Sequence, residues 1–166
     1  MSPAELKDRT IIVTGASRGI GLAVAKRLHA AGARIIGISR TTPPADAGFM
    51  HHVELDLSDT KHLPAELRRI AAAHPEASAV VLNAGAGRFG DLEQFSAEQV
   101  QALVQLNLVS PMLVAREFLP ALTRHGAGDL VFIGSEAALR GGRRGAVYSA
   151  TKFGLRGFVQ SLRQEC

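Results

Sequence analysis

Tyr148 and Lys152 form the pair of side chains in this sequence that is best suited to acid–base chemistry. Their four-residue spacing places them on one face of a helix. A free phenol has a pKa of about 10, which is too high for proton exchange near neutrality. An ammonium held within a few ångströms favours the phenolate and lowers that pKa, so Lys152 could make Tyr148 a general acid and base.

Ser135 lies just after an apolar run that is typical of a strand. Ligands of α/β sheets bind where strands end, so its hydroxyl could hold a carbonyl or alcohol oxygen beside the tyrosine. A serine nucleophile is not indicated, because residues 134–138 lack the Gly-x-Ser-x-Gly elbow and no histidine is placed to suggest a triad. The six histidines lack metal-ligand spacing with acids or cysteine, so no metal site is expected.

A glycine-rich segment, residues 14–21, follows a β-branched run and precedes a helical pattern. Glycines let the backbone turn sharply and approach a bound pyrophosphate, and the following helix offers free N–H groups and a positive dipole. This context favours dinucleotide binding, although the glycines alone also fit an ordinary strand–turn–helix. The candidate cofactor-binding residues here are Gly15, Ser17, Arg18, Gly19, Ile20 and Gly21.

The residues at the end of the second apolar run indicate which dinucleotide would bind. An acid at this place would bind the ribose hydroxyls of NAD, but the sequence has Ser39 and Arg40. A guanidinium can pair with a 2′-phosphate through two hydrogen bonds, and Arg18 could add a second positive charge. The sequence therefore favours NADP(H) over NAD(H).

The elements that must position these side chains alternate between strands and helices. Apolar, β-branched runs predict strands at 10–13, 34–38, 53–55, 79–82 and 130–133. Amphipathic spacing predicts helices at 20–31, 59–73, 97–106, 111–123 and 148–165. Ser58 or Asp59 is expected to cap the second helix, and Pro111 to lie in the first turn of the fourth. Strands that are apolar throughout indicate a parallel sheet covered on both faces, hence one α/β domain.

Several motifs occur together and in a fixed order: Gly-x-x-x-Gly-x-Gly after a threonine, Asn83-Ala84-Gly85, Asn107, Ser135 and the Tyr148/Lys152 pair. This set resembles the classical short-chain dehydrogenase/reductase family over essentially all of the chain from residue 10 on. The resemblance implies a doubly wound, Rossmann-like parallel sheet with strands in the order 3-2-1-4-5. It also implies hydride transfer between NADP(H) and a carbonyl or alcohol substrate, with the tyrosine as acid and base.

The resemblance further implies roles for individual residues. Asp56 would contact the adenine ring, and Lys152 would hydrogen-bond the nicotinamide ribose. Asn107 would order a water in a proton relay, although a cap or kink asparagine fits that residue equally well. Residues 83–85 would line the cofactor cleft, even though Leu82 stands where the family has a first asparagine. The predicted catalytic residues are Asn107, Ser135, Tyr148 and Lys152. The cofactor-binding set adds Arg40, Asp56, Leu57, Asn83, Ala84, Gly85, Tyr148 and Lys152.

The resembled family continues beyond the Tyr/Lys helix with a sixth strand, a substrate-covering segment and a seventh strand, whereas this sequence ends at Cys166. Residues 1–166 are therefore expected to form a single NADP-binding domain that is incomplete at its C-terminal end. The alternative function is that of an inactive cofactor-binding fragment without the substrate-binding segment. The family also implies a homodimer or homotetramer in which helices 111–123 and 148–165 pair.

Composition argues against several other classes of function. The net charge is +4 and the pI about 9.8, but the chain has one Tyr, no Trp and no aromatics among its basic residues, so no nucleic acid is expected. Apolar runs shorter than a bilayer requires indicate no membrane partner. The single cysteine fits a reducing compartment, and we expect a cytoplasmic protein that acts on a small molecule.

The basic excess is concentrated near the end of the sequence. From Arg140 onward there are six basic residues and one acid. Arg140, Arg143 and Arg144 flank a pair of glycines in the loop that precedes the Tyr/Lys helix. They could attract an anionic substrate, or they could form a solvated loop, which is the more common role of surface arginines.

Overall fold

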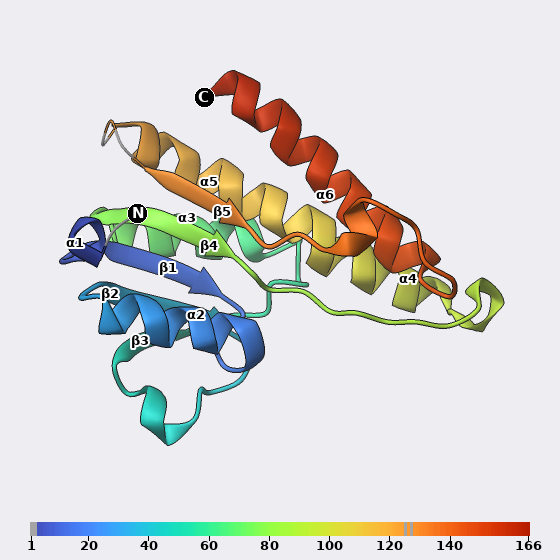
Figure 1. The fold of residues 1–166 in the computed structure, drawn as a ribbon, viewed down its shortest axis with the longest axis horizontal. Coiled ribbons are helices and arrows are strands. Elements are labelled where there is room, and N and C mark those ends of the chain that lie inside the picture. The colour runs from blue at the N-terminus through green and yellow to red at the C-terminus, as the bar shows by residue number, and fades with distance from the viewer. Residues whose placement is uncertain (1–2, 125, 127) are drawn as a thin grey trace.

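The computed structural model describes residues 3–124, 126 and 128–166, and its centre is a parallel sheet of five strands (Figure 1). The strands lie in the order β3-β2-β1-β4-β5, which confirms the predicted doubly wound arrangement. Their bounds are β1 (Thr10–Thr14), β2 (Arg34–Ser39), β3 (Met50–Glu54), β4 (Ala77–Leu82) and β5 (Asp129–Phe132). The strand order reverses between β1 and β4, and ligands of such sheets bind at this switch point.

Helices cover both faces of the sheet (Figure 1). α2 packs on β1 and β2, whereas α3 and α5 pack on each other over the opposite face. α6 contacts α4 and the turn that follows β5. The helix bounds are α1 (Pro3–Leu6), α2 (Gly19–Ala30), α3 (Leu63–Ala73), α4 (Ala97–Val104), α5 (Ser110–Arg124) and α6 (Ala146–Glu165). Short 3-10 turns are η1 (Ala45–Ala47), η2 (Leu92–Gln94) and η4 (Glu136–Ala138).

The central strand β1 shows how alternate residues build two cores. Ile12 belongs to the cluster under α3 and α5, together with Phe118. Ile11 and Val13 belong to the cluster under α2, together with Ala25. Successive side chains of a strand point to opposite faces, so a strand covered on both faces must be apolar throughout.

The segment predicted as two helices is one continuous helix. α4 passes into α5 through a π-helical turn, η3 (Gln105–Val109), in which the N–H of Ser110 donates to the carbonyl of Gln105. Pro111 has no N–H for a regular helical bond, and the wide turn accommodates this defect without ending the helix.

The continuous helix Ala97–Arg124 has 28 residues and is long and apolar enough to cross a membrane by length and composition alone. The sequence predicts no membrane span, because its apolar runs are shorter than a bilayer requires, whereas the continuous helix passes the test of length and mean hydropathy. Its α5 half packs on β4 and α3, and its α4 half contacts α6. Packing in the protein core therefore accounts for the buried part of its apolar residues, among them Leu103, Val114 and Phe118, while 39% of the apolar window is buried.

Two other boundaries differ from the predicted ones. β3 begins at Met50, not at residue 53, because it pairs with β2 from its first residue, although two histidines interrupt its apolar pattern. α3 begins at Leu63, and neither Ser58 nor Asp59 caps it, since His62 occupies the N-cap position without a side-chain bond. The carboxylate of Asp59 instead contacts the His62 ring at 2.8 Å. The remaining predicted elements lie within two residues of the observed bounds.

The register of the sheet aligns the carboxyl ends of its strands. Thr14 at the end of β1 lies opposite Ile38 in β2, and Leu82 at the end of β4 lies opposite Phe132 in β5. The loops that follow these strands therefore emerge at the same edge. This edge is where the predicted functional residues come together.

Candidate active site

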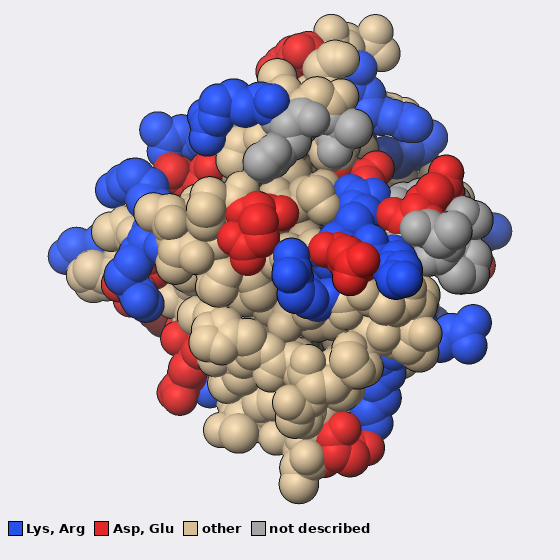
Figure 2. Space-filling view, turned by 90° about the vertical axis from the view of Figure 1, so that its left-hand side faces the viewer, with Lys and Arg blue, Asp and Glu red and all other residues tan. Residues whose placement is uncertain are grey.

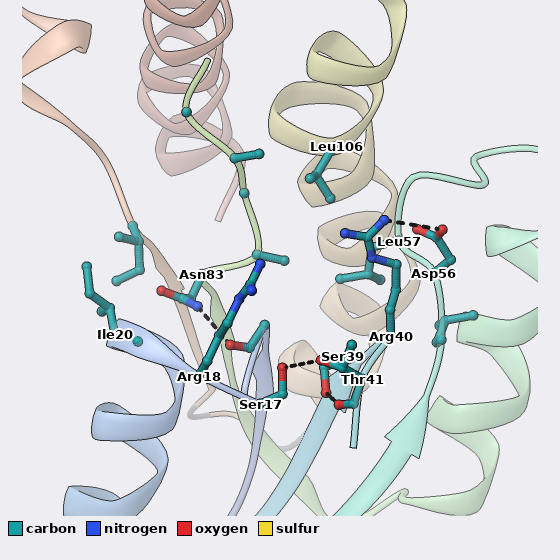
Figure 3. Close-up of a pocket in the computed structure, with 18 of the residues that line it drawn as sticks. Ser17, Arg18, Ile20, Ser39, Arg40, Thr41, Asp56, Leu57, Asn83 and Leu106 are labelled. Carbon is teal, nitrogen blue, oxygen red and sulfur yellow. Dashed lines mark hydrogen bonds and ion pairs between the residues drawn. The ribbon is translucent and has the colours of Figure 1, made fainter. Parts of the chain in front are cut away.

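A cleft of about 390 Å³ opens at the carboxyl edge of the sheet, between the glycine turn after β1 and the start of α6 (Figure 3). Loops after all five strands contribute to it. Most of the candidate residues from the sequence line this cleft, namely Gly15, Ser17, Arg18, Gly19, Ile20, Arg40, Asp56, Leu57, Asn83, Ala84, Gly85, Tyr148 and Lys152.

The turn from β1 into α2 requires glycine at three positions, and one of them is Gly19, with a φ of 57°. Gly15 has a φ of 69°, in the left-handed region that side chains disfavour. A Cβ on Gly21 would collide with the carbonyl of Gly15 and crowd the amide of Asn83. Arg18 occupies the N-cap of α2 and makes no side-chain cap bond, so the first N–H groups of the helix can receive an anion from the cleft.

Thr14 and Asn83 lock the glycine turn to the end of β4. Thr14 Oγ1 accepts hydrogen bonds from the backbone N–H groups of Asn83 and Ala84, both at 3.0 Å. Asn83 Nδ2 in turn donates to the carbonyl oxygen of Thr14 at 3.0 Å. These bonds join two walls of the cleft, and they explain why a threonine precedes the glycines and an asparagine follows β4.

The end of the cleft at β2 and β3 carries charged and hydroxyl side chains (Figure 3). Arg40 Nη1 lies 3.7 Å from Asp56 Oδ2, and both side chains are exposed. Ser39 Oγ donates to the carbonyl oxygen of Thr41 at 3.0 Å, and Thr41 Oγ1 shares a 2.9 Å hydrogen bond with Ser17 Oγ. The end of β2 is therefore tied to the glycine turn, with the Arg40 guanidinium held beside the cleft.

Tyr148 and Lys152 lie one turn apart on α6, and both line the cleft. Lys152 is buried, and its Nζ donates to the carbonyl oxygen of Ile133 at 3.0 Å. The ammonium lies 6.0 Å from the centroid of the Tyr148 ring. Burial lowers the pKa of Lys152, because removal from water disfavours the charged form. A lysine and a tyrosine thus share one wall of the cleft.

Asn107 lies in the π-helical turn and is 1% exposed. Its Oδ1 accepts from the N–H of Ala86 at 2.9 Å, and its Nδ2 donates to the Ala86 carbonyl at 2.8 Å and to Thr151 Oγ1 at 3.3 Å. Thr151 Oγ1 also donates to the carbonyl of Tyr148 at 2.7 Å. Asn107 therefore clamps the loop after β4 to α6 from behind the cleft lining, and its role in a water relay stays a prediction.

Ser135 and Gly21 also lie outside the cleft lining. Ser135 caps η4, where its Oγ accepts a hydrogen bond from the N–H of Ala137 at 3.2 Å. The hydroxyl can still donate one hydrogen bond of its own. The structure therefore leaves Ser135 chemically able to hold an oxygen atom, while its place in the reaction stays a prediction.

Sequence reasoning missed several residues that line the cleft. Most continue the segments that were named, because every residue just past a strand end reaches the same edge: Ser39, Thr41, Leu55, Ala86, Gly87, Ile133 and Gly134. Their signal was the strand end itself. Leu106 comes from the π-helical turn instead, and no local pattern points to it.

Comparisons with known proteins agree with this geometry. The sequence model described as short chain dehydrogenase matches residues 9–166. The chain belongs to the short-chain dehydrogenase family. Among relatives in the family, 3-oxoacyl-acyl-carrier-protein reductase FabG of Escherichia coli is 33% identical over 169 residues, covering 96% of this chain and 68% of the relative. Ketoacyl reductase HetN of Nostoc sp. is 29% identical over 169 residues, covering 96% of this chain and 59% of the relative.

Solved short-chain dehydrogenase structures share the fold. One is described as a putative NAD(P)-dependent gluconate 5-dehydrogenase from Beutenbergia cavernae with bound NADP at low occupancy. It is 31% identical to this chain and superposes with a TM-score of 0.91. The match covers 99% of this chain and 69% of the neighbour. The chain thus spans 59% of the length of HetN and 68% of that of FabG.

Proposed function

We propose that this chain acts in an NADP(H)-dependent oxidoreductase that transfers a hydride between the cofactor and a carbonyl or alcohol substrate. The observation that carries the proposal is that Tyr148 and Lys152 line the same cleft as the glycine turn. The turn suits phosphate groups, and a tyrosine beside an ammonium suits proton transfer. One cleft therefore combines dinucleotide binding with acid–base chemistry.

The residues of the cleft fit a dinucleotide with an additional phosphate. The start of α2 offers N–H groups, and Gly21 lets this helix pack closely against the Gly15 carbonyl and the Asn83 amide, which shapes the turn. Arg18 and Arg40 bring two guanidinium groups to the cleft lining. Arg40 also lies beside Asp56 and offsets a carboxylate that would otherwise repel a 2′-phosphate. The Beutenbergia cavernae neighbour is described as NAD(P)-dependent with bound NADP, which supports a cofactor of this class.

In carbonyl reduction, the nicotinamide cofactor supplies the hydride when bound. Tyr148 donates its phenolic proton to the carbonyl oxygen as that oxygen gains negative charge. Lys152, held by its bond to the Ile133 carbonyl, stabilises the resulting phenolate. Ser135 donates a hydrogen bond to the same substrate oxygen. Lys152 then passes a proton back to Tyr148 and regains one from solvent through the water that Asn107 would order, and the reverse sequence oxidises an alcohol.

A second candidate function is binding of the dinucleotide without turnover. One observation favours it: Asn107 and Ser135 do not line the cleft, whereas the glycine turn does. In this case the chain binds NADPH and leaves every carbonyl compound unreduced.

Two measurements on the purified chain separate these candidates. NADPH binding is followed by the fluorescence of the reduced nicotinamide, and turnover by the loss of its absorbance with a panel of ketones. The reductase proposal expects both signals. Binding without turnover of any ketone supports the second candidate, and failure to bind NADPH contradicts both.

We further propose that the chain self-associates as a homodimer or homotetramer through α5 and α6. Phe153 on α6 is 44% exposed, and aromatic side chains are enriched at interfaces between proteins. Light scattering on the eluate of a sizing column measures the mass directly. Phe153→Glu is expected to yield monomers, and a monomeric unmodified chain at all concentrations contradicts the proposal.

A further inference from the structure

A second cavity of about 650 Å³ lies next to the Tyr148 cleft. Phe89 lines it, and the Phe89 ring centroid is 5.5 Å from that of Tyr148. Ser149, the residue after Tyr148, also lines it. We call this cavity the arginine pocket; its main side chains are Phe89, Glu136, Ala137, Leu139, Arg140 and Arg143.

Contacts on both sides hold the loop that carries these arginines. The carbonyl of Arg144 accepts from the N–H of Gly90 at 2.8 Å, and Arg144 Nε lies 3.7 Å from Asp91. On the other side, Arg156 donates from α6 to the carbonyl of Ala138 at 3.2 Å. Arg144 and Arg156 thus position the loop against its neighbours, so the pocket is a shaped feature of the fold.

The side chains of Arg140 and Arg143 differ from those of Arg144 and Arg156 in their contacts. Both are exposed and line the pocket, and their guanidinium groups make no hydrogen bond or ion pair with any residue in the described ranges. Glu136 supplies one negative charge to the lining, against two positive charges from these arginines. The pocket therefore has a net positive charge that the protein itself does not neutralise, which favours an anionic ligand.

The same pocket has apolar walls. Phe89 is 66% exposed and Leu139 is 65% exposed, and both line the cavity. Large apolar side chains left open beside a catalytic tyrosine favour a ligand with an apolar body. The cations and the apolar walls together thus favour a ligand that has both an anionic group and an apolar body.

We propose that the substrate is a carbonyl compound, or the corresponding alcohol, that has an apolar body and an anionic group such as a carboxylate or phosphate. The body lies against Phe89 and Leu139, and the anionic group pairs with Arg140 and Arg143. This inference rests on the proposed oxidoreductase function, because it takes the ketone to be the group that reaches Tyr148. It also makes a claim about binding that can be tested without turnover.

Two ketones that differ in one charge test the proposal. Isothermal titration calorimetry measures the affinity of the chain, with and without NADP⁺, for 4-acetylbenzoate and for its methyl ester. We expect the acid to bind about tenfold more tightly than the ester, a difference of about 1.4 kcal/mol. The preference should shrink as salt is added, because both arginines are exposed to solvent.

Substitutions assign the preference to the pocket. The double variant R140Q/R143Q is expected to bind acid and ester about equally, while its ester affinity and melting temperature stay unchanged. R163Q is the matched control, because it removes an exposed arginine at the far end of α6 (Figure 1) and should keep the preference for the acid. Phe89→Ala should weaken both ligands alike.

Each contrary result overturns the inference. Equal binding of acid and ester, no binding of either, or an acid preference that survives in R140Q/R143Q all contradict an anion site at these arginines. Loss of the preference in R163Q as well would mean that overall charge, and not the pocket, attracts the acid. Failure of the oxidoreductase proposal looks different: NADPH is not bound, or is bound without turnover, whatever the ligand affinities.

Discussion

The two ends of the sheet use arginine in opposite ways. At the amino end, Arg9 donates to Ser78 Oγ at 2.9 Å, to the Ser78 carbonyl at 2.8 Å and to the carboxylate of Asp129 at 2.8 Å. At the carboxyl end, Arg18 lines the cleft and its side chain makes no contact of this kind with the part of the chain that the structure describes. Position along the strands, more than residue type, decides whether an arginine joins strands together or faces a ligand.

The distribution of charge follows the same division. Figure 2 views the amino end, where basic and acidic side chains are interspersed. The two cavities at the carboxyl edge instead hold more cations than acids: Arg18, Arg40 and Lys152 against Asp56 in the cleft, and Arg140 and Arg143 against Glu136 in the arginine pocket. A concave surface with a net positive charge concentrates anions. Substitutions at the carboxyl edge should therefore change binding or turnover, and those at the amino end should change stability.

The largest expected effect is that of Tyr148→Phe on turnover. Loss of the proton donor should lower kcat about 10³-fold, within the usual range for a general acid. The Phe ring keeps the contact with Phe89, so NADPH affinity and the melting temperature should not change. Steady-state kinetics and a thermal melt on the same preparation check this. A variant that kept more than a tenth of the unmodified kcat would have lost less than about 1.4 kcal/mol of transition-state stabilisation. That result would contradict the role of Tyr148 as the general acid.

The next effect concerns the two ends of a single strand. Arg34 begins β2 and Arg40 follows its last residue. Arg40→Gln should lower the affinity for NADPH relative to NADH about ten- to hundredfold, because a charge-assisted phosphate contact is lost and Asp56 is left unpaired. Arg34→Gln is the control: its Nε donates to Thr10 at the far edge, so the cofactor preference should persist. Titration of both variants with NADPH and NADH measures this preference. An equal change of the NADPH/NADH affinity ratio in the two variants would contradict the difference between the two ends of the strand.

Substitutions at the amino end of the sheet should change stability and leave cofactor binding unchanged. Arg9→Ala is expected to lower the free energy of unfolding by about 1–2 kcal/mol, since three partly buried hydrogen bonds between strands are lost. In a chain of this size the melting temperature should fall by about 2–8 °C. Arg69→Ala removes an exposed ion pair with Glu66 and should change stability by less than about 0.5 kcal/mol. A change in NADPH affinity in Arg9→Ala would contradict the division between the two ends.

Local patterns were sufficient for the interior of the sheet and for the glycine turn. Ile11 and Val13 face one core and Ile12 the other, so burial forces an apolar run that is visible in the sequence. The edge strand β3 is less buried and contains His51 and His52, so its start depends on pairing with β2 and not on its own pattern. The unbroken helix through residues 105–109 is likewise a tertiary result, because Pro111 normally signals a helix start.

The candidate site likewise combines features that local sequence patterns predict with features that depend on tertiary contacts. Motif spacing identified Tyr148 and Lys152, because residues four apart on a helix share a face. The motif also named Asn107, whose catalytic role stays a prediction, but it could not reveal that the amide is bonded to Ala86 and Thr151, since those contacts join segments far apart in the chain. Arg140 and Arg144 look alike in sequence, and only the bond to Gly90 and the contact with Asp91 distinguish a loop anchor from an open cation.

The smallest expected effect sharpens the comparison, because it sets stability against function in one residue. Burial lowers the pKa of Lys152 below its ordinary value of 10.5, so the unfolded chain binds this proton more readily than the folded one. That penalty is present at neutral pH and disappears as the pH rises toward 10.5. Lys152→Met should therefore melt slightly higher near neutrality although it impairs turnover, and this advantage in stability should shrink at alkaline pH.

The gain should be small, because methionine leaves the Ile133 carbonyl without its donor. Lys26→Met is the matched control, since Lys26 is an exposed lysine paired with Asp46 and lies away from the cleft. Thermal melts of both variants at neutral and alkaline pH make the test. A Lys152→Met variant that is less stable than the unmodified chain at every pH would show that the lysine holds α6 to β5 more than its burial opposes folding, and that the carboxyl edge contributes to stability as the amino end does.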